Sequence, residues 1–158
     1  MKRECVARFV AALLLGMAAT GAAQTARLAG GGTEESYPGF DRNDYPGDAA
    51  LPALRKTFRY TGYWLNKPQG ESSNSWVGKR AILRRCGFGF LVLFTGRTDA
   101  KIKTEERKGR DAAELGAAEG RAAVAAAARE GFPKNVLIFL DQEEGGRLLP
   151  EQAAYLFA

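Results

Sequence analysis

Three acidic residues lie where apolar runs end, and carboxyl groups with this spacing could carry out acid/base chemistry. Asp141 and Glu143 follow the run Val136–Leu140 and stand two residues apart, so they share one face of an extended chain. Asp41 ends the shorter run Gly39–Asp41. In a crowded and partly buried cluster, one carboxyl group takes a raised pKa. Such a cluster therefore supplies both an acid and a base at neutral pH.

The sequence contains no histidine, which excludes the usual general base of serine and cysteine hydrolases and the commonest zinc ligand. A hydrolase of this composition must depend on carboxylates. We expect no cofactor and no metal site, since the acidic spacing lacks the regular loop of a calcium-binding hand. From the residue pattern alone, Asp141 and Glu143 are equally well explained as solvated loop residues, and Asp41 as part of a turn.

Residues 1–23 have the three parts of a secretory signal peptide: a basic start, an apolar run over 9–19 and small residues at 21–23. We expect cleavage near Ala23 and a secreted, periplasmic or cell-envelope location. The alternative is a membrane anchor, but the apolar run is roughly half of the ~20 residues that span a bilayer. No stable membrane span is expected after cleavage. Residues 24–36 are glycine-rich without hydrophobic period, which indicates a flexible linker.

The remaining segment, 37–158, alternates apolar and helical stretches, an order typical of an α/β protein with a parallel sheet. We expect four parallel strands in sequential order. The predicted strands are Gly39–Asp41, Tyr60–Leu65, Phe88–Phe94 and Val136–Leu140, and the predicted helices are Leu51–Thr57, about Ser75–Cys86, Asp111–Glu130 and one that begins at Pro150.

Two segments between these elements carry further predictions. Asp111 with Glu114 predicts a capped helix start, and Gly116 and Gly120, one turn apart, favour close packing of that helix on the sheet. The mixed charges of Arg97–Arg110 are typical of a solvated loop. The alternative for this segment is contact with an anionic cell-wall polymer.

A complete (β/α)8 barrel needs about 250 residues, whereas this chain has 158. The last predicted helix shows no stop signal before Ala158. We therefore expect a fold of the (β/α) TIM-barrel type limited to about the first four βα units, as a truncated product or completed by a partner. An open fourth strand edge favours self-association and weak or no turnover by this chain alone.

The segment Tyr37–Gly47, YPGFDRNDYPG, resembles the opening strand of glycoside-hydrolase-like barrel domains of unknown function. These domains are related to family 25 glycoside hydrolases, the lysozyme-like muramidases. Leu140–Gly145 is similar to the Asp-x-Glu strand end of that family. The resemblance covers about 37–158 and implies that Glu143 donates a proton to the glycosidic oxygen. It also implies that Asp141 and Asp41 stabilise or orient an N-acetyl sugar.

The leading hypothesis is a secreted glycoside hydrolase acting by paired carboxylates on peptidoglycan or a related N-acetylhexosamine glycan. Trp64 and Asn66 share a strand face and are candidate substrate contacts, the indole for stacking and the amide for hydrogen bonding. Asp44, in the loop after the first strand, is the third candidate substrate contact. The alternative for Trp64 is a core position, and Trp76 is equally open.

Two further hypotheses belong to other classes. The chain could be a catalytically inactive exported glycan-binding or cell-envelope module, since Arg42–Asp44 stands where the muramidase pattern usually has serine and a further aromatic residue or histidine. It could also be a truncated non-functional product. A nucleic-acid partner is not expected, because a formal net charge of +5 is too small to indicate one.

Overall fold

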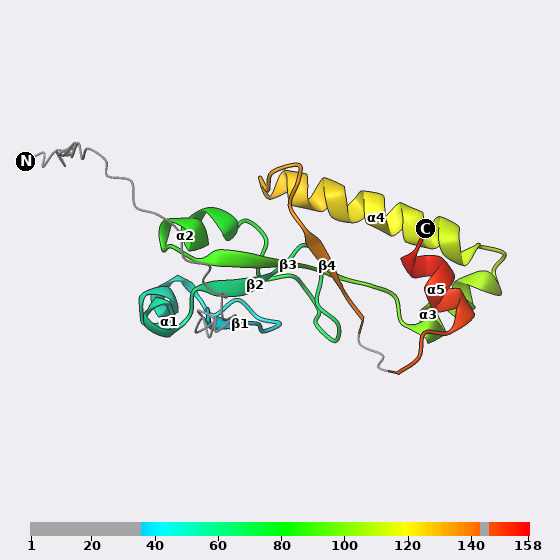
Figure 1. Ribbon diagram of the computed structural model, residues 1–158, viewed down its shortest axis with the longest axis horizontal. Coiled ribbons are helices and arrows are strands. Elements are labelled where there is room, and N and C mark those ends of the chain that lie inside the picture. The colour runs from blue at the N-terminus through cyan, green and yellow to red at the C-terminus, as the bar shows by residue number, and fades with distance from the viewer. Residues whose placement is uncertain (1–35, 143–145) are drawn as a thin grey trace, which may run out of the picture. The chain divides into compact units, whose positions relative to one another are not determined.

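The computed structural model describes residues 36–142 and 146–158, all of which belong to one compact unit, Glu35–Ala158 (Figure 1). The predicted signal peptide, and the predicted linker except for Ser36, lie outside the described residues. No helix in the described part of the chain has the length and apolarity needed to cross a membrane.

Within the described residues, four strands form one sheet in the order β1-β2-β3-β4, and every neighbouring pair is parallel. Their bounds are β1 Gly39–Phe40, β2 Tyr60–Trp64, β3 Gly89–Thr95 and β4 Ile138–Asp141. This confirms the prediction of four parallel strands in sequential order. Each connection is long enough to contain a helix, which a parallel crossover requires.

Between and after these strands, the described residues form one 3-10 helix and five α-helices, most of them where the sequence predicts them. Their bounds are η1 Asp48–Ala50, α1 Leu51–Thr57, α2 Arg80–Arg85, α3 Asp99–Glu106, α4 Ala112–Arg129 and α5 Pro150–Leu156. The predicted cap of α4 is confirmed, because the Asp111 carboxylate accepts a hydrogen bond from the backbone N–H of Glu114 at 3.0 Å. Figure 1 shows α4 running alongside β3 and β4.

The helix predicted from about Ser75 to Cys86 is wrong at its start, because α2 begins only at Arg80. Gly78 has φ +76°, a left-handed conformation that does not continue a right-handed helix. Before it, the backbone N–H of Trp76 donates to Asn74 Oδ1 at 3.0 Å. This turn directs the Trp76 side chain into the core, where it is fully buried.

The loop predicted over Arg97–Arg110 is also wrong in part, because Asp99–Glu106 forms α3. Ile102 is fully buried and Glu105 nearly so. The Glu105 carboxylate accepts hydrogen bonds from Lys108 and Arg110. The helix is stabilised because these inward positions are buried and their charges are paired. The charged composition of the segment did not predict it.

Most of the core lies on the face of the sheet that carries Tyr63, while Trp64 and Leu93 are buried on the other face. The Tyr63 ring is fully buried and meets the rings of Trp76, Phe90 and Phe132 edge to face, at centroid distances of 6.1, 5.7 and 5.3 Å. Its hydroxyl donates to Glu130 Oε2 at 2.5 Å. Side chains of α1, α2 and α4 complete the same buried cluster, so the helices that follow the strands pack against this face.

β4 is an edge strand, and part of it remains exposed. The sequence around it is apolar at every position, as for a strand buried on both faces, yet Leu137 is 75% exposed and Phe139 49%. Strand alternation places Phe139 on the face of Asp141, and Leu137 directly precedes the strand. Since β3 is the only strand that pairs with β4 among the described residues, this apolar face lacks the neighbour that would cover it.

Gly116 lets α5 approach α4 closely. A methyl group at residue 116 would collide with the backbone carbonyl of Tyr155, whereas one at Gly120 would meet nothing within 4 Å. The close packing predicted for the two glycines therefore occurs at Gly116 alone, and its partner is helix α5 and not the sheet.

This difference gives a matched pair of substitutions in α4. We expect Gly120→Ala to raise the free energy of unfolding by about 0.5–1 kcal/mol, because alanine favours a helix interior over glycine. We expect Gly116→Ala to lower it by about 1–3 kcal/mol, because overpacking against backbone outweighs that gain. Urea denaturation followed by circular dichroism measures both. Equal stabilisation by the two variants would contradict the observed α4–α5 contact.

Candidate functional site

Asp41 lies directly after β1, with its carboxylate against the neighbouring strand. The register that pairs Phe40 with Thr61 brings Asp41 beside Gly62, and a methyl group at residue 62 would collide with Asp41 Oδ1. The absence of a side chain at Gly62 is what lets this carboxylate rest on the sheet. Gly62 is therefore a site residue that sequence reasoning missed, although a glycine inside a strand is a known sign of close approach.

The surroundings of Asp41 alter its acidity. Burial against the sheet raises the pKa of the Asp41 carboxyl, although the residue as a whole is exposed, and hydrogen bonds from the Arg42 backbone and the Trp64 side chain partly oppose this. The negative charge of Asp141 raises the same pKa further. The charge at the end of β4 therefore reaches the carboxyl group that follows β1.

The raised pKa predicts a stability change for Asp41→Asn. The folded state prefers protonated Asp41, so this group costs stability above its ordinary pKa of 3.8, and the cost disappears as pH falls. We expect the variant to be more stable at pH 7, by less than about 1 kcal/mol once solvent screening is included. The gain should vanish toward pH 3. Urea denaturation across this range checks it, and a variant less stable at pH 7 would show that burial is not the dominant cause.

Asp141 is the last residue of β4 and pairs in register with Thr95. Its backbone carbonyl accepts a hydrogen bond from the N–H of Gly96 at 3.1 Å. Its Oδ2 atom is buried, and no described residue offers it a hydrogen bond. An unpartnered buried carboxylate oxygen requires an explanation, and a ligand or substrate group is one that suits the end of a parallel strand.

The other predicted acidic residues are not part of this arrangement as described. Glu143, the predicted proton donor, lies outside the described residues. Asp44 is exposed in the loop after β1. The same loop is anchored at Asn43, whose carbonyl accepts a hydrogen bond from Trp76 Nε1 at 2.9 Å.

Trp64 and Asn66 are engaged within the protein. Trp64 is only 3% exposed and its indole N–H donates to the carbonyl of Arg42 at 3.2 Å, so it occupies the core position left open by the sequence. The Asn66 amide bonds the backbone of Thr95 twice, with Nδ2 donating at 3.0 Å and Oδ1 accepting at 2.7 Å. Trp64 therefore positions the loop that follows Asp41, and Asn66 extends the pairing of β2 with β3.

A second group of polar residues, which sequence reasoning missed, joins α4 and α5 to the segment that follows β3. Arg97 Nε contacts Glu119 Oε1 at 2.6 Å, and the Tyr155 hydroxyl donates to Glu119 Oε2. Burial and this hydrogen bond raise the pKa of Tyr155, so the phenol stays protonated. The three residues come from separate segments, and no local motif in the sequence relates them.

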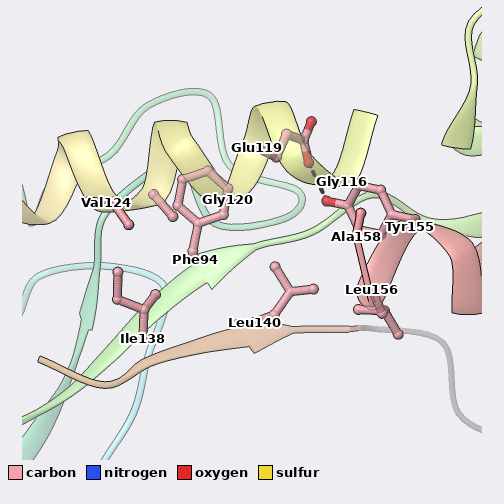
Figure 2. A pocket seen from close by; sticks show the side chains of 11 residues that line it. Phe94, Gly116, Glu119, Gly120, Val124, Ile138, Leu140, Tyr155, Leu156 and Ala158 are labelled. Carbon is pink, nitrogen blue, oxygen red and sulfur yellow. Dashed lines mark hydrogen bonds between the residues drawn. The ribbon is translucent and has the colours of Figure 1, made fainter. Parts of the chain in front are cut away.

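Glu119 and Tyr155 border a cavity of about 270 Å³ between β3, β4, α4 and α5. Figure 2 shows the Tyr155 hydroxyl directed at Glu119, with Phe94, Ile138 and Leu140 below them on the strands. Leu140 and Asp141 point to opposite faces of β4. This cavity is therefore separate from the carboxylates, which lie on the open face.

Comparisons with known proteins add no family to these observations. No protein-family profile, curated protein or solved structure matches the chain. Within the described ranges, no three Asp, Glu or Cys side chains gather closely enough to hold a metal ion.

Proposed function

We propose that the chain is a secreted glycoside-hydrolase-like protein that acts on an N-acetylhexosamine glycan such as peptidoglycan. In this proposal Glu143 donates a proton to the glycosidic oxygen, and Asp41 and Asp141 stabilise or orient the sugar. The observation that carries it is that Asp41, directly after the first strand, and Asp141, at the end of the fourth, lie at the same edge of one parallel sheet, where the charge of Asp141 contributes to the raised pKa of Asp41. Catalytic groups of parallel α/β proteins lie at that end of the sheet.

The proposal also assigns the sheet to the (β/α) barrel type. Four parallel strands in sequential order, each followed by a helix, support this assignment. In such a barrel the helices lie outside and the opposite sheet face points inward. Here Tyr63 lies on the helical side, and the half-exposed ring of Phe139 lies on the other. That exposed face and the free edge of β4 support self-association with a second copy.

The chemistry requires two carboxyl groups with different proton affinities. Glu143 is the proton donor in this proposal, and the raised pKa of Asp41 supports a site in which neighbouring carboxyl groups differ in proton affinity. The unpartnered Oδ2 of Asp141 supports a role as acceptor of a sugar hydroxyl or amide. Signal-peptide features in residues 1–23 support delivery to a cell-wall substrate.

The test measures release of reducing ends from an N-acetylglucosamine oligomer and from peptidoglycan by the full chain. We expect weak turnover, because the open sheet face leaves the catalytic groups with little surrounding support. Asp141→Asn should abolish it. Turnover that Asp141→Asn leaves unchanged would overturn the assignment of this site.

The second candidate is an exported glycan-binding module without catalysis. The observation that favours it is the half-exposed ring of Phe139 on the same face as Asp141, since an exposed ring beside polar groups suits sugar stacking. Glycan binding that is lost in Phe139→Ala, with no turnover by the parent chain, would favour this module over the hydrolase.

A further inference from the structure

A second hollow, of about 290 Å³, lies beyond the carboxyl ends of β2 and β3, between α3 and α4. The side chains that give it its chemical character are Asn66, Lys67, Thr95, Arg97, Lys101 and Glu119. Three of them are cationic and one is anionic, so the lining carries a net positive charge. A concave surface with one predominant sign of charge concentrates ligands of the opposite sign.

Arg97 is held in this hollow at three points. Its Nε contacts Glu119 at 2.6 Å, its backbone N–H donates to the Tyr155 hydroxyl at 3.3 Å, and its carbonyl accepts from Gln142 Nε2 at 3.3 Å. The Tyr155 hydroxyl in turn fixes Glu119, as Figure 2 shows. A guanidinium held in this way loses little conformational freedom when it binds an anion.

The cations of this hollow keep donors available. Among the described residues, no hydrogen bond engages the terminal nitrogens of Arg97, and no carboxylate lies within ion-pair distance of Lys101. The Lys67 ammonium group donates a hydrogen bond to the carbonyl of Glu71 at 2.5 Å, which keeps its positive charge near the rim of the hollow. Planar guanidinium donors match carboxylate and phosphate oxygens.

The hollow adjoins the carboxylate site through one residue. Gly96 contributes to its lining and donates its backbone N–H to the carbonyl of Asp141 at 3.1 Å. The two hydrogen bonds between the Asn66 amide and the Thr95 backbone fix these two residues in the lining of the hollow. A ligand whose neutral part lies at Asp141 could therefore place a charged substituent in the hollow.

We propose that this hollow, with Arg97 and Lys101 as the main contacts, binds an anionic substituent of the glycan, a carboxylate or a phosphate group. That the ligand is a glycan rests on the proposed function. The anion site itself rests on the charge of the hollow and on the fixed position of Arg97.

The experiment measures calorimetric binding of three sugars to the full chain: N-acetylmuramic acid, N-acetylglucosamine 6-phosphate and neutral N-acetylglucosamine. We expect at least one acidic sugar to bind about tenfold or more tightly than the neutral one, and the better acidic sugar identifies the group. We expect Lys101→Gln to weaken acidic binding about threefold to fivefold, the range of one exposed ion pair. Arg97→Lys should weaken it further, because lysine cannot form the planar two-donor contact.

Lys134→Gln is the matched control, because it removes an exposed positive charge from the loop before β4, at the opposite end of that strand from Asp141. It should leave binding unchanged. Equal binding of all three sugars, no binding of any, or equal effects of Lys101→Gln and Lys134→Gln would overturn the anion site. Lys101-dependent binding without hydrolysis would retain the site and reject the hydrolase, and Asp141-dependent hydrolysis without acidic preference would do the reverse.

Discussion

Glycan hydrolysis is expected to fall about 10²- to 10⁴-fold in Glu143→Gln, the usual contribution of a positioned general acid. Glutamine keeps the shape of the side chain and removes the proton that the leaving oxygen requires. The neighbouring Glu144→Gln is the matched control, since it changes the same charge one residue further on. In the proposed mechanism Glu143 alone is the proton donor, so Glu144→Gln should keep nearly full turnover.

Reducing-end release at pH values from about 4 to 7 measures both variants, within the range where raised carboxyl pKa values fall. A loss shared equally by the two variants would indicate a general effect of negative charge near Asp141. A loss in Glu144→Gln alone would reject the assignment of Glu143 as the acid. Only a selective loss in Glu143→Gln agrees with the paired-carboxylate chemistry.

The second large effect concerns stability, where Trp76→Ala should lower the free energy of unfolding by about 3–5 kcal/mol. Trp76 is fully buried, its ring packs against Tyr45 and Tyr63 at 5.3 and 6.1 Å, and its indole N–H bonds the carbonyl of Asn43. The alanine variant loses the packing, opens a cavity and leaves that carbonyl without its donor.

Val77→Ala is the control for Trp76→Ala, because Val77 is adjacent in sequence but 60% exposed. Its cost should stay within about 0.5 kcal/mol, as for surface substitutions. Urea denaturation followed by circular dichroism compares the two. A small cost for Trp76→Ala would show that the loop of Asp41 and Asn43 does not depend on this ring, and would leave Trp76 free for the sugar contact considered from the sequence.

The predictable part of this fold is the part that local patterns encode. The apolar run before Asp141 and the alanine-rich stretch after Asp111 each form the element their pattern indicates. The start of α2 and the whole of α3 were not predictable in the same way. The left-handed Gly78 delays the start of α2 within a pattern that looks helical from Ser75 onward. Ile102 of α3 is buried because α4 and α5 supply its packing partners.

The candidate site likewise has features that local sequence determines and features that depend on packing. The sequence by itself determined that carboxylates follow the first and fourth strands, because residue type and strand period are local properties. It also determined that a hydrolase here would have to work without histidine. Only the tertiary structure decided that Asp41 rests on Gly62, that Trp64 is buried and that Arg97, Glu119 and Tyr155 meet. These contacts join residues 21 or more positions apart, and their existence depends on how the strands and helices pack, which no local spacing specifies.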